Sequence, residues 1–125
     1  MKSDPYKRLI DGMVVLAQRS ISAGRVFKFG HPVRPDVSDA QLSDEERKLK
    51  AIFARLNDQD RQVLGRALLT ERESGLHDFA AFLQEATSKG KMNIKWDGET
   101  FTLPRSSTMQ EDFIRRLSGK DWEKR

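Results

Sequence analysis

The chain has 125 residues, no cysteine and a formal net charge of +4. It can therefore form no disulfide, thiolate nucleophile or cysteine-ligated zinc site, and no apolar run approaches the roughly 18 residues that span a bilayer. At this length we expect a single domain over residues 1–125. The lack of cysteines and of a secretory leader pattern favours a cytoplasmic location.

Charge is unevenly distributed along the sequence. Residues 1–35 carry seven Lys/Arg and two Asp/Glu, residues 36–88 carry seven and eleven, and residues 89–125 carry nine and six. Much of the acidic middle falls in the first turns of predicted helices, where the helix dipole favours negative charge. The basic flanks have no such local explanation, so they are the candidate surface for a partner.

The spacing of apolar residues predicts an α+β fold of mainly α character, a compact bundle of about five helices with one C-terminal β-hairpin. Asp4 and Pro5 mark the start of the first helix, expected over about 5–23, with Gly24 as its stop. Residues 25–34 lack a helical period and contain Gly30 and Pro32. We expect a short extended piece and a rigid loop there.

Capping signals predict the next helices. Ser43 and Glu46 form a capping box in front of a helix over about 44–56. Asn57 and Asp58 interrupt that helix and start another over about 58–72. The segment from Glu71 to Gly75 is expected to end it, and a fourth helix follows over about 76–88 and closes at Gly90. A further capping box at 108–111 opens a last helix over about 109–118.

The pattern changes to strand alternation over about 92–103. Asp97-Gly98 is a strong signal for a two-residue hairpin turn. Such a turn pairs Trp96 with Glu99, Ile94 with Phe101 and Met92 with Leu103. One face of this ribbon is apolar and must pack on the helices, because an isolated hairpin is marginal in water. Trp122 is expected to fold back onto the domain.

Residues with catalytic potential are few. The two histidines, His31 and His77, lie in no metal-binding spacing such as HExxH. No serine lies in a nucleophile elbow, and no glycine-rich phosphate loop is present. We therefore expect no catalytic residue, no metal and no cofactor, so that the chain is not an enzyme; catalysis by His31 or His77 is the least favoured hypothesis.

The predicted function is a small, soluble, non-enzymatic protein-binding module, either a domain of bacterial type or an engineered variant of one. Its partner surface is expected to use basic and aromatic residues, the kinds enriched at interface centres. These residues are Arg25, Phe27, Lys28, Phe29, His31, Arg34, Trp96 and Trp122.

Two alternative functions remain open. Nucleic acid could bind the basic flanks, although the acidic middle would repel it and residues 76–88 offer no Lys or Arg to read bases. A structural homodimer with no separate ligand is the other alternative. A membrane partner is not expected.

Overall fold

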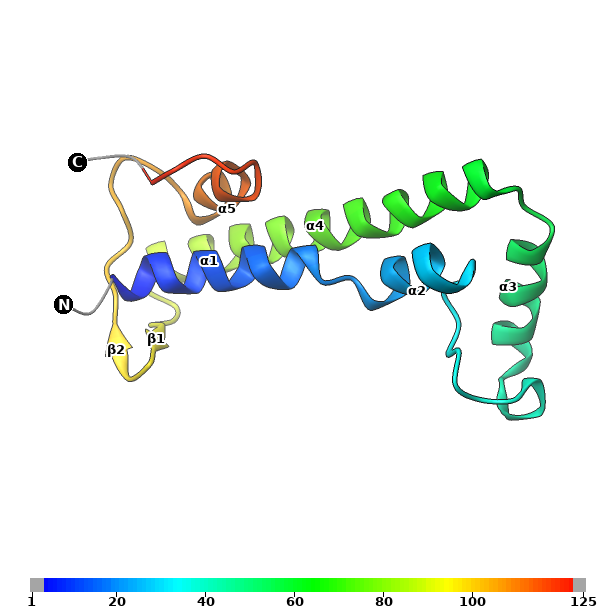
Figure 1. Ribbon diagram of the computed structural model, residues 1–125. Coiled ribbons are helices and arrows are strands. Elements are labelled where there is room, and N and C mark those ends of the chain that lie inside the picture. The colour runs from blue at the N-terminus through cyan, green and yellow to red at the C-terminus, as the bar shows by residue number, and fades with distance from the viewer. Residues whose placement is uncertain (1–3, 123–125) are drawn as a thin grey trace. The chain divides into compact units, whose positions relative to one another are not determined.

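The computed structural model describes residues 4–122, which are mainly helical with one short antiparallel hairpin (Figure 1). This confirms the predicted fold class. The elements in chain order are α1 (Pro5–Gln18), α2 (Ile21–Phe29), a 3-10 turn η1 (Asp39–Gln41), α3 (Asp44–Ala54), α4 (Asp58–Ser88), β1 (Lys95–Trp96), β2 (Glu99–Thr100) and α5 (Met109–Leu117). In the described part of the chain, none of the helices combines the length and apolar character that a bilayer crossing requires.

The chain divides into two compact units. Unit 1 consists of Met1–Gln18 and Glu73–Arg125, and unit 2 consists of Arg19–Arg72. Helix α4 contributes its C-terminal half to unit 1 and its N-terminal half to unit 2. The expectation of a single domain over the whole chain stays a prediction, and each unit is described by itself.

Unit 1 has a hydrophobic core built on α1. The apolar stripe of α1 lies on one face at helical spacing, as the sequence predicts. The buried core residues are Tyr6, Ile10, Met13, Val14, Ala17, Ala80, Leu83, Phe101, Met109 and Phe113. The predicted apolar face of the hairpin packs on the core in part: Phe101 is buried and Ile94 and Leu103 are partly buried against it, whereas Met92 and Trp96 are exposed.

A buried carboxylate ties α1 to α5 inside unit 1. Asp112 is 5% exposed, and its Oδ2 accepts hydrogen bonds from Tyr6 Oη at 2.5 Å and from Ser107 Oγ at 2.8 Å. Gln84 of α4 also reaches α5, because its Oε1 accepts the backbone N–H of Met109 at 3.0 Å. A buried charge is tolerated only with such partners, so these contacts fix where α5 begins.

The hairpin turn forms where predicted, but the strands are shorter than the expected 92–103. Trp96 pairs with Glu99 across the turn, and both Asp97 and Gly98 adopt positive φ, as a type I′ turn requires. Each strand has two residues. Beyond them the expected pairs Ile94–Phe101 and Met92–Leu103 do not form, and Phe101 is buried in the core of unit 1.

Unit 2 has a smaller core than unit 1. Its buried residues are Ala23, Val26, Val33, Leu42 and Phe53. The predicted Ser43–Glu46 capping box forms in both directions, and Asn57 Oδ1 accepts the Asp60 N–H at the start of α4. The exposed large apolar residues of this unit are Ile21, Phe27, Phe29, Leu49, Ile52, Val63 and Leu64.

The structure differs from the predicted first helix and from the loop expected after it. Helix α1 ends at Gln18, and Ser20 caps a second helix by accepting the Ala23 N–H on its hydroxyl at 3.1 Å. Helix α2 then includes residues 25–29, the first part of the expected loop, and ends before Gly30, which has φ 82°, whereas residues 30–34 are not helical, as expected. Gly24 is not the stop but an interior residue of α2. A serine hydroxyl that caps a helix start overrides the weak breaking effect of one glycine.

A second difference concerns α4. The segment from Glu71 to Gly75 was expected to separate two helices, yet α4 is continuous from Asp58 to Ser88. A glycine at position 75 still has the backbone N–H that a helix requires, and it costs only about 1 kcal/mol relative to Ala. That cost is too small to break a helix that continues on both sides. The predicted stop at Gly90 is confirmed, with φ 71°.

Candidate partner-binding surface

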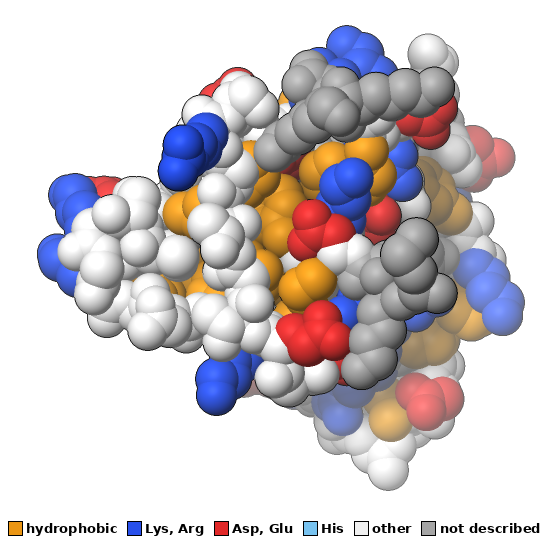
Figure 2. Space-filling model, turned by 90° about the vertical axis from the view of Figure 1, so that its left-hand side faces the viewer, with side chains coloured by type: hydrophobic (Ala, Val, Ile, Leu, Met, Phe, Trp, Pro, Cys, Tyr) orange, Lys and Arg blue, Asp and Glu red, His pale blue; other side chains and the backbone are white. Residues whose placement is uncertain are grey.

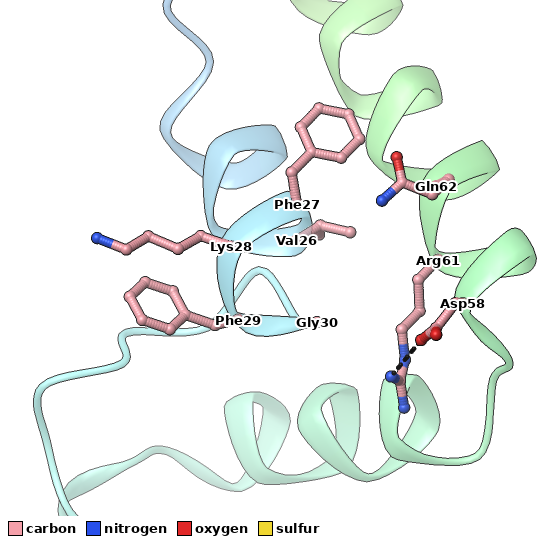
Figure 3. Close-up of a pocket in the computed structure, with 8 residues that line it drawn as sticks. All are labelled: Val26, Phe27, Lys28, Phe29, Gly30, Asp58, Arg61 and Gln62. Atoms are coloured by element: carbon pink, nitrogen blue, oxygen red, sulfur yellow. Dashed lines mark hydrogen bonds and ion pairs between the residues drawn. The ribbon is translucent and has the colours of Figure 1, made fainter.

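Helix α2 turns its neighbouring aromatic residues in opposite directions (Figure 3). Phe27 extends toward α4, where its ring lies against Gly65. The side chains of Lys28 and Phe29 project away from α4. The two phenylalanines that the sequence offers as one candidate pair are similarly exposed, 42% and 45%, but only the ring of Phe27 lies against α4.

The surface side of α2 is a continuous mixed face of apolar and cationic residues, which we call the α2 outer face: Ile21, Arg25, Lys28 and Phe29. They share one broad side of the helix because Ile21, Arg25 and Phe29 follow one another at a spacing of four residues and Lys28 lies three residues after Arg25. Ile21 is 71% exposed and Phe29 45% exposed. The Lys28 Nζ lies 5.2 Å from the centre of the Phe29 ring. Within the described part of the chain, neither Arg25 nor Lys28 forms an ion pair with a carboxylate.

A cavity of about 400 Å³ lies in unit 2 between the end of α2 and the first turns of α4 (Figure 3). It adjoins the α2 outer face, because Lys28 and Phe29 belong to both. The lining residues are Val26, Phe27, Lys28, Phe29, Gly30, Asp58, Arg61 and Gln62.

Arg61 is the central polar group of this cavity. Its Nε donates to the carbonyl of Phe53 at 3.0 Å, and Nη2 donates to the carbonyl of Ala54 at 3.4 Å, so the guanidinium satisfies the C-terminal end of α3. Its Nη1 contacts Asp58 Oδ1 at 3.3 Å. The Asp58 side chain is 99% exposed, so this last contact is a weakly held surface ion pair.

Two of the predicted site residues are bound to groups of unit 2 itself. Arg34 donates two hydrogen bonds of 3.0 Å to the carboxylate of Glu46. The hydrogen bond from Arg34 is the main reason that the pKa of Glu46 falls to about 2. His31 Nδ1 accepts the backbone N–H of Val33 at 3.2 Å, and burial, followed by the charge of Lys50, lowers the pKa of His31.

The remaining two predicted site residues, Trp96 and Trp122, lie in unit 1. Trp96 is 38% exposed beside the hairpin turn, and a Cβ at Gly12 would lie 4.0 Å from its ring. Figure 2 looks onto the end of unit 1 near the hairpin, where hydrophobic side chains remain visible among polar and charged ones. Neither tryptophan belongs to the unit that carries the α2 outer face.

Trp122 folds back onto unit 1, as predicted. Its Nε1 donates to Asp11 Oδ2 at 3.2 Å, and its ring centre lies 5.5 Å from both Lys7 Nζ and Arg116 Cζ. The same Asp11 accepts Arg116 Nε at 2.7 Å. These contacts fasten the C-terminal segment to α1 and α5.

Three residues of this surface, Ile21, Arg61 and Gly65, are not among the predicted site residues. The prediction placed Ile21 near the end of the first helix. Arg61 could have been found from its position in the sequence, just after the end of one helix and in the first turn of the next. The three-residue connection 55–57 brings the free carbonyls of α3 beside the first turn of α4, where a cation can satisfy them.

The other residues considered for catalysis or metal binding form only local contacts. His77 Nδ1 lies 3.4 Å from Asp78 Oδ1 on the surface of α4. Among residues 4–122, no three His, Cys, Asp or Glu side chains lie together in a group that could hold a metal ion.

The comparisons with known proteins give a family and nothing narrower. No curated protein and no solved structure matches the chain. Over residues 1–124 the sequence matches the model of the family described as "Family of unknown function (DUF6547)". The chain therefore belongs to this family, DUF6547.

Proposed function

We propose that the chain is a non-enzymatic protein-binding module whose partner contacts the α2 outer face, and that it works in the cytoplasm. The observation that carries the proposal is the exposure of Ile21 and Phe29 beside two cations that have no carboxylate partner in the described residues. Arginine and aromatic residues dominate the energetics of protein interfaces, and clustered exposed apolar residues mark interaction sites.

The proposal rests on fewer residues than the sequence suggested. Arg34 is bound by Glu46, and Trp122 is bound by Asp11. A partner that used Arg34 or Trp122 would first have to break these contacts, and their free energy would be lost from binding. No such rearrangement is needed at Arg25, Lys28 and Phe29, so these are the residues that a partner would bind.

The test is a pair of matched charge reversals. The double variant R25E/K28E changes the α2 outer face, whereas K48E/R55E makes the same change in charge at two exposed residues of α3 and its end that also have no ion-pair partner in the structure as described. Proteins captured from a cell lysate by the wild-type chain are identified, purified and titrated against all three forms.

The expected result is a purified protein that binds the wild type and K48E/R55E alike and binds R25E/K28E at least about tenfold more weakly, which is the loss typical of a binding hot spot. The variant F29A should weaken the same complex without unfolding the chain. Loss of binding by R25E/K28E and K48E/R55E alike would contradict the assigned surface.

The two alternative functions give different results in the same experiment. If nucleic acid is the partner, captured material disappears after nuclease treatment and binding strengthens steeply as salt is lowered. If a second copy of the chain is the partner, light scattering on the purified wild type shows a dimer that R25E/K28E dissociates. Either result would replace the proposal of a separate protein partner.

A further inference from the structure

We propose that the cavity between α2 and α4 receives a carboxylate side chain of the partner, which takes the place of Asp58 on the guanidinium of Arg61. This inference rests on the proposed function and adds the chemistry of the partner. The partner is an acidic protein segment with an apolar side chain next to its acid. Three properties of the cavity support it.

First, Arg61 is already oriented. Its Nε is held by the carbonyl of Phe53, so the plane of the guanidinium is fixed before a ligand arrives. The side chain is nevertheless 28% exposed, and it lines the cavity. An arginine fixed in this way presents its remaining N–H donors to an incoming carboxylate at little entropic cost.

Second, the present occupant is easily exchanged. Asp58 reaches Arg61 through one contact of 3.3 Å, and its side chain is almost fully exposed. A surface pair within one helical turn contributes little to stability. When one carboxylate replaces another on Arg61, the charge at the guanidinium stays balanced, and Asp58 is released into water where it is already nearly solvated.

Third, the surroundings match an acidic segment with an apolar neighbour. Lys28 lines the cavity, but its ammonium projects away from α4 onto the α2 outer face, where Arg25 precedes it by one turn, so this positive charge lies beside the cavity and not inside it. The half-exposed ring of Phe29 lies on the same outer face, next to these cations. The cavity of about 400 Å³ has room for the end of one side chain and adjoining backbone.

The experiment uses two variants of the first turn of α4. D58N removes the carboxylate that competes for Arg61, whereas D60N removes a neighbouring carboxylate that forms no ion pair within the described residues. Both lower the negative charge of the same helical turn by one. The probe is a fluorescein-labelled peptide of sequence Glu-Glu-Leu-Phe-Glu-Glu, with Gln-Gln-Leu-Phe-Gln-Gln as its neutral counterpart, and binding is measured by fluorescence polarisation.

We expect the acidic peptide to bind the wild type, the neutral peptide to bind more weakly, and D58N to bind the acidic peptide about threefold more tightly than D60N does, since a weak competing ion pair has been removed. Equal affinity of D58N and D60N would overturn the inference. So would equal binding of the two peptides, or no binding of the acidic one. In each of these cases the proposed function is judged separately, by whether R25E/K28E loses the captured partner.

Discussion

The ring of Phe27 occupies the space that a side chain at position 65 would need. A Cβ built on Gly65 would lie 2.5 Å from Cε1 of Phe27, a distance that real Cβ atoms do not tolerate. Gly65 is buried in the middle of α4, where glycine is normally unfavourable. Its role is to let α2 approach α4 closely enough for Phe27 to pack.

Replacing Gly65 should therefore destabilise the protein although it improves helix propensity. We expect G65A to lose about 1–3 kcal/mol, the usual cost of overpacking. The matched control is G75A in the same helix, where nothing lies within 4 Å of a new Cβ, and it should gain up to about 1 kcal/mol. Urea unfolding followed by circular dichroism measures both. If F27A does not relieve the cost of G65A, the clash with Phe27 is not its cause.

The hydrogen bond between Tyr6 and Asp112 predicts a second large effect. In Y6F the buried Asp112 carboxylate loses its 2.5 Å donor while remaining buried, and we expect a loss of about 1.5–3 kcal/mol, the range for hydrogen bonds to charged groups. S107A removes the other donor to the same oxygen and should also destabilise. Its control, S106A, changes an exposed neighbour and should leave the urea midpoint unchanged.

The parts of the fold that the sequence predicted well are set by short-range contacts. The Ser43–Glu46 box, the Asn57 cap and the Asp97-Gly98 turn each depend on residues at most three positions apart. Such contacts form in the same way in many folds, which is why residue spacing reveals them. The helical stripe of α1 was equally visible, because one side of it faces a single core.

The parts that the sequence did not predict depend on distant residues. Leu49 and Ile52 of α3 are 40% and 45% exposed, although apolar residues three apart on a helix usually face a core, because little of unit 2 covers them. Arg34 was counted as a partner contact, but Glu46, twelve residues away, holds it. The basic and aromatic character of residues 25–29 could be read directly from the sequence. The sequence did not show which of these side chains face outward, because that depends on α2 being a helix.

The end of α2 provides a direct check of the corrected helix boundary. Gly30 adopts φ 82°, a left-handed conformation that costs other residues roughly 1–2 kcal/mol, whereas Gly24 lies inside the helix with open space around it. We therefore expect G30A to lower the thermal midpoint and G24A to raise it. Had Gly24 been the helix stop, the two substitutions would have the opposite effects.

Glu46 predicts how unit 2 responds to acid. Its pKa is lowered from 4.5 to about 2, first by the hydrogen bond from Arg34 and then by the Ser43 backbone. A lowered carboxyl pKa stabilises the folded state fully above about pH 4.5, and this stabilisation is lost as the pH falls toward 2. Asp39, whose pKa is lowered by Lys50, acts in the same direction in unit 2, and Glu85, whose pKa is lowered by Lys89, does so in unit 1.

The variant E46Q isolates this contribution. Glutamine can still accept the Ser43 N–H, but it has no charge for Arg34 and does not titrate. Thermal midpoints measured between pH 5 and 2 should fall less steeply for E46Q than for the wild type. E45Q alters an exposed neighbour without an ion-pair partner in the described structure, so it should follow the wild type. Parallel curves for E46Q and the wild type would show that the Arg34 pair does not carry the acid response.

Asp11 predicts the behaviour of the C-terminal segment, because it binds both Trp122 Nε1 and Arg116 Nε. In a W96F background Trp122 is the only tryptophan, so its fluorescence reports this segment alone. D11A removes both acceptors. We expect the emission to shift to longer wavelength and the indole to become more accessible to acrylamide as it meets water.

D121A is the control. Asp121 also contacts Arg116, but at 3.8 Å and from a fully exposed side chain, so its loss should leave Trp122 in place. An unshifted spectrum in D11A would mean that stacking on Lys7, Arg116 and Tyr6 holds the indole without the hydrogen bond.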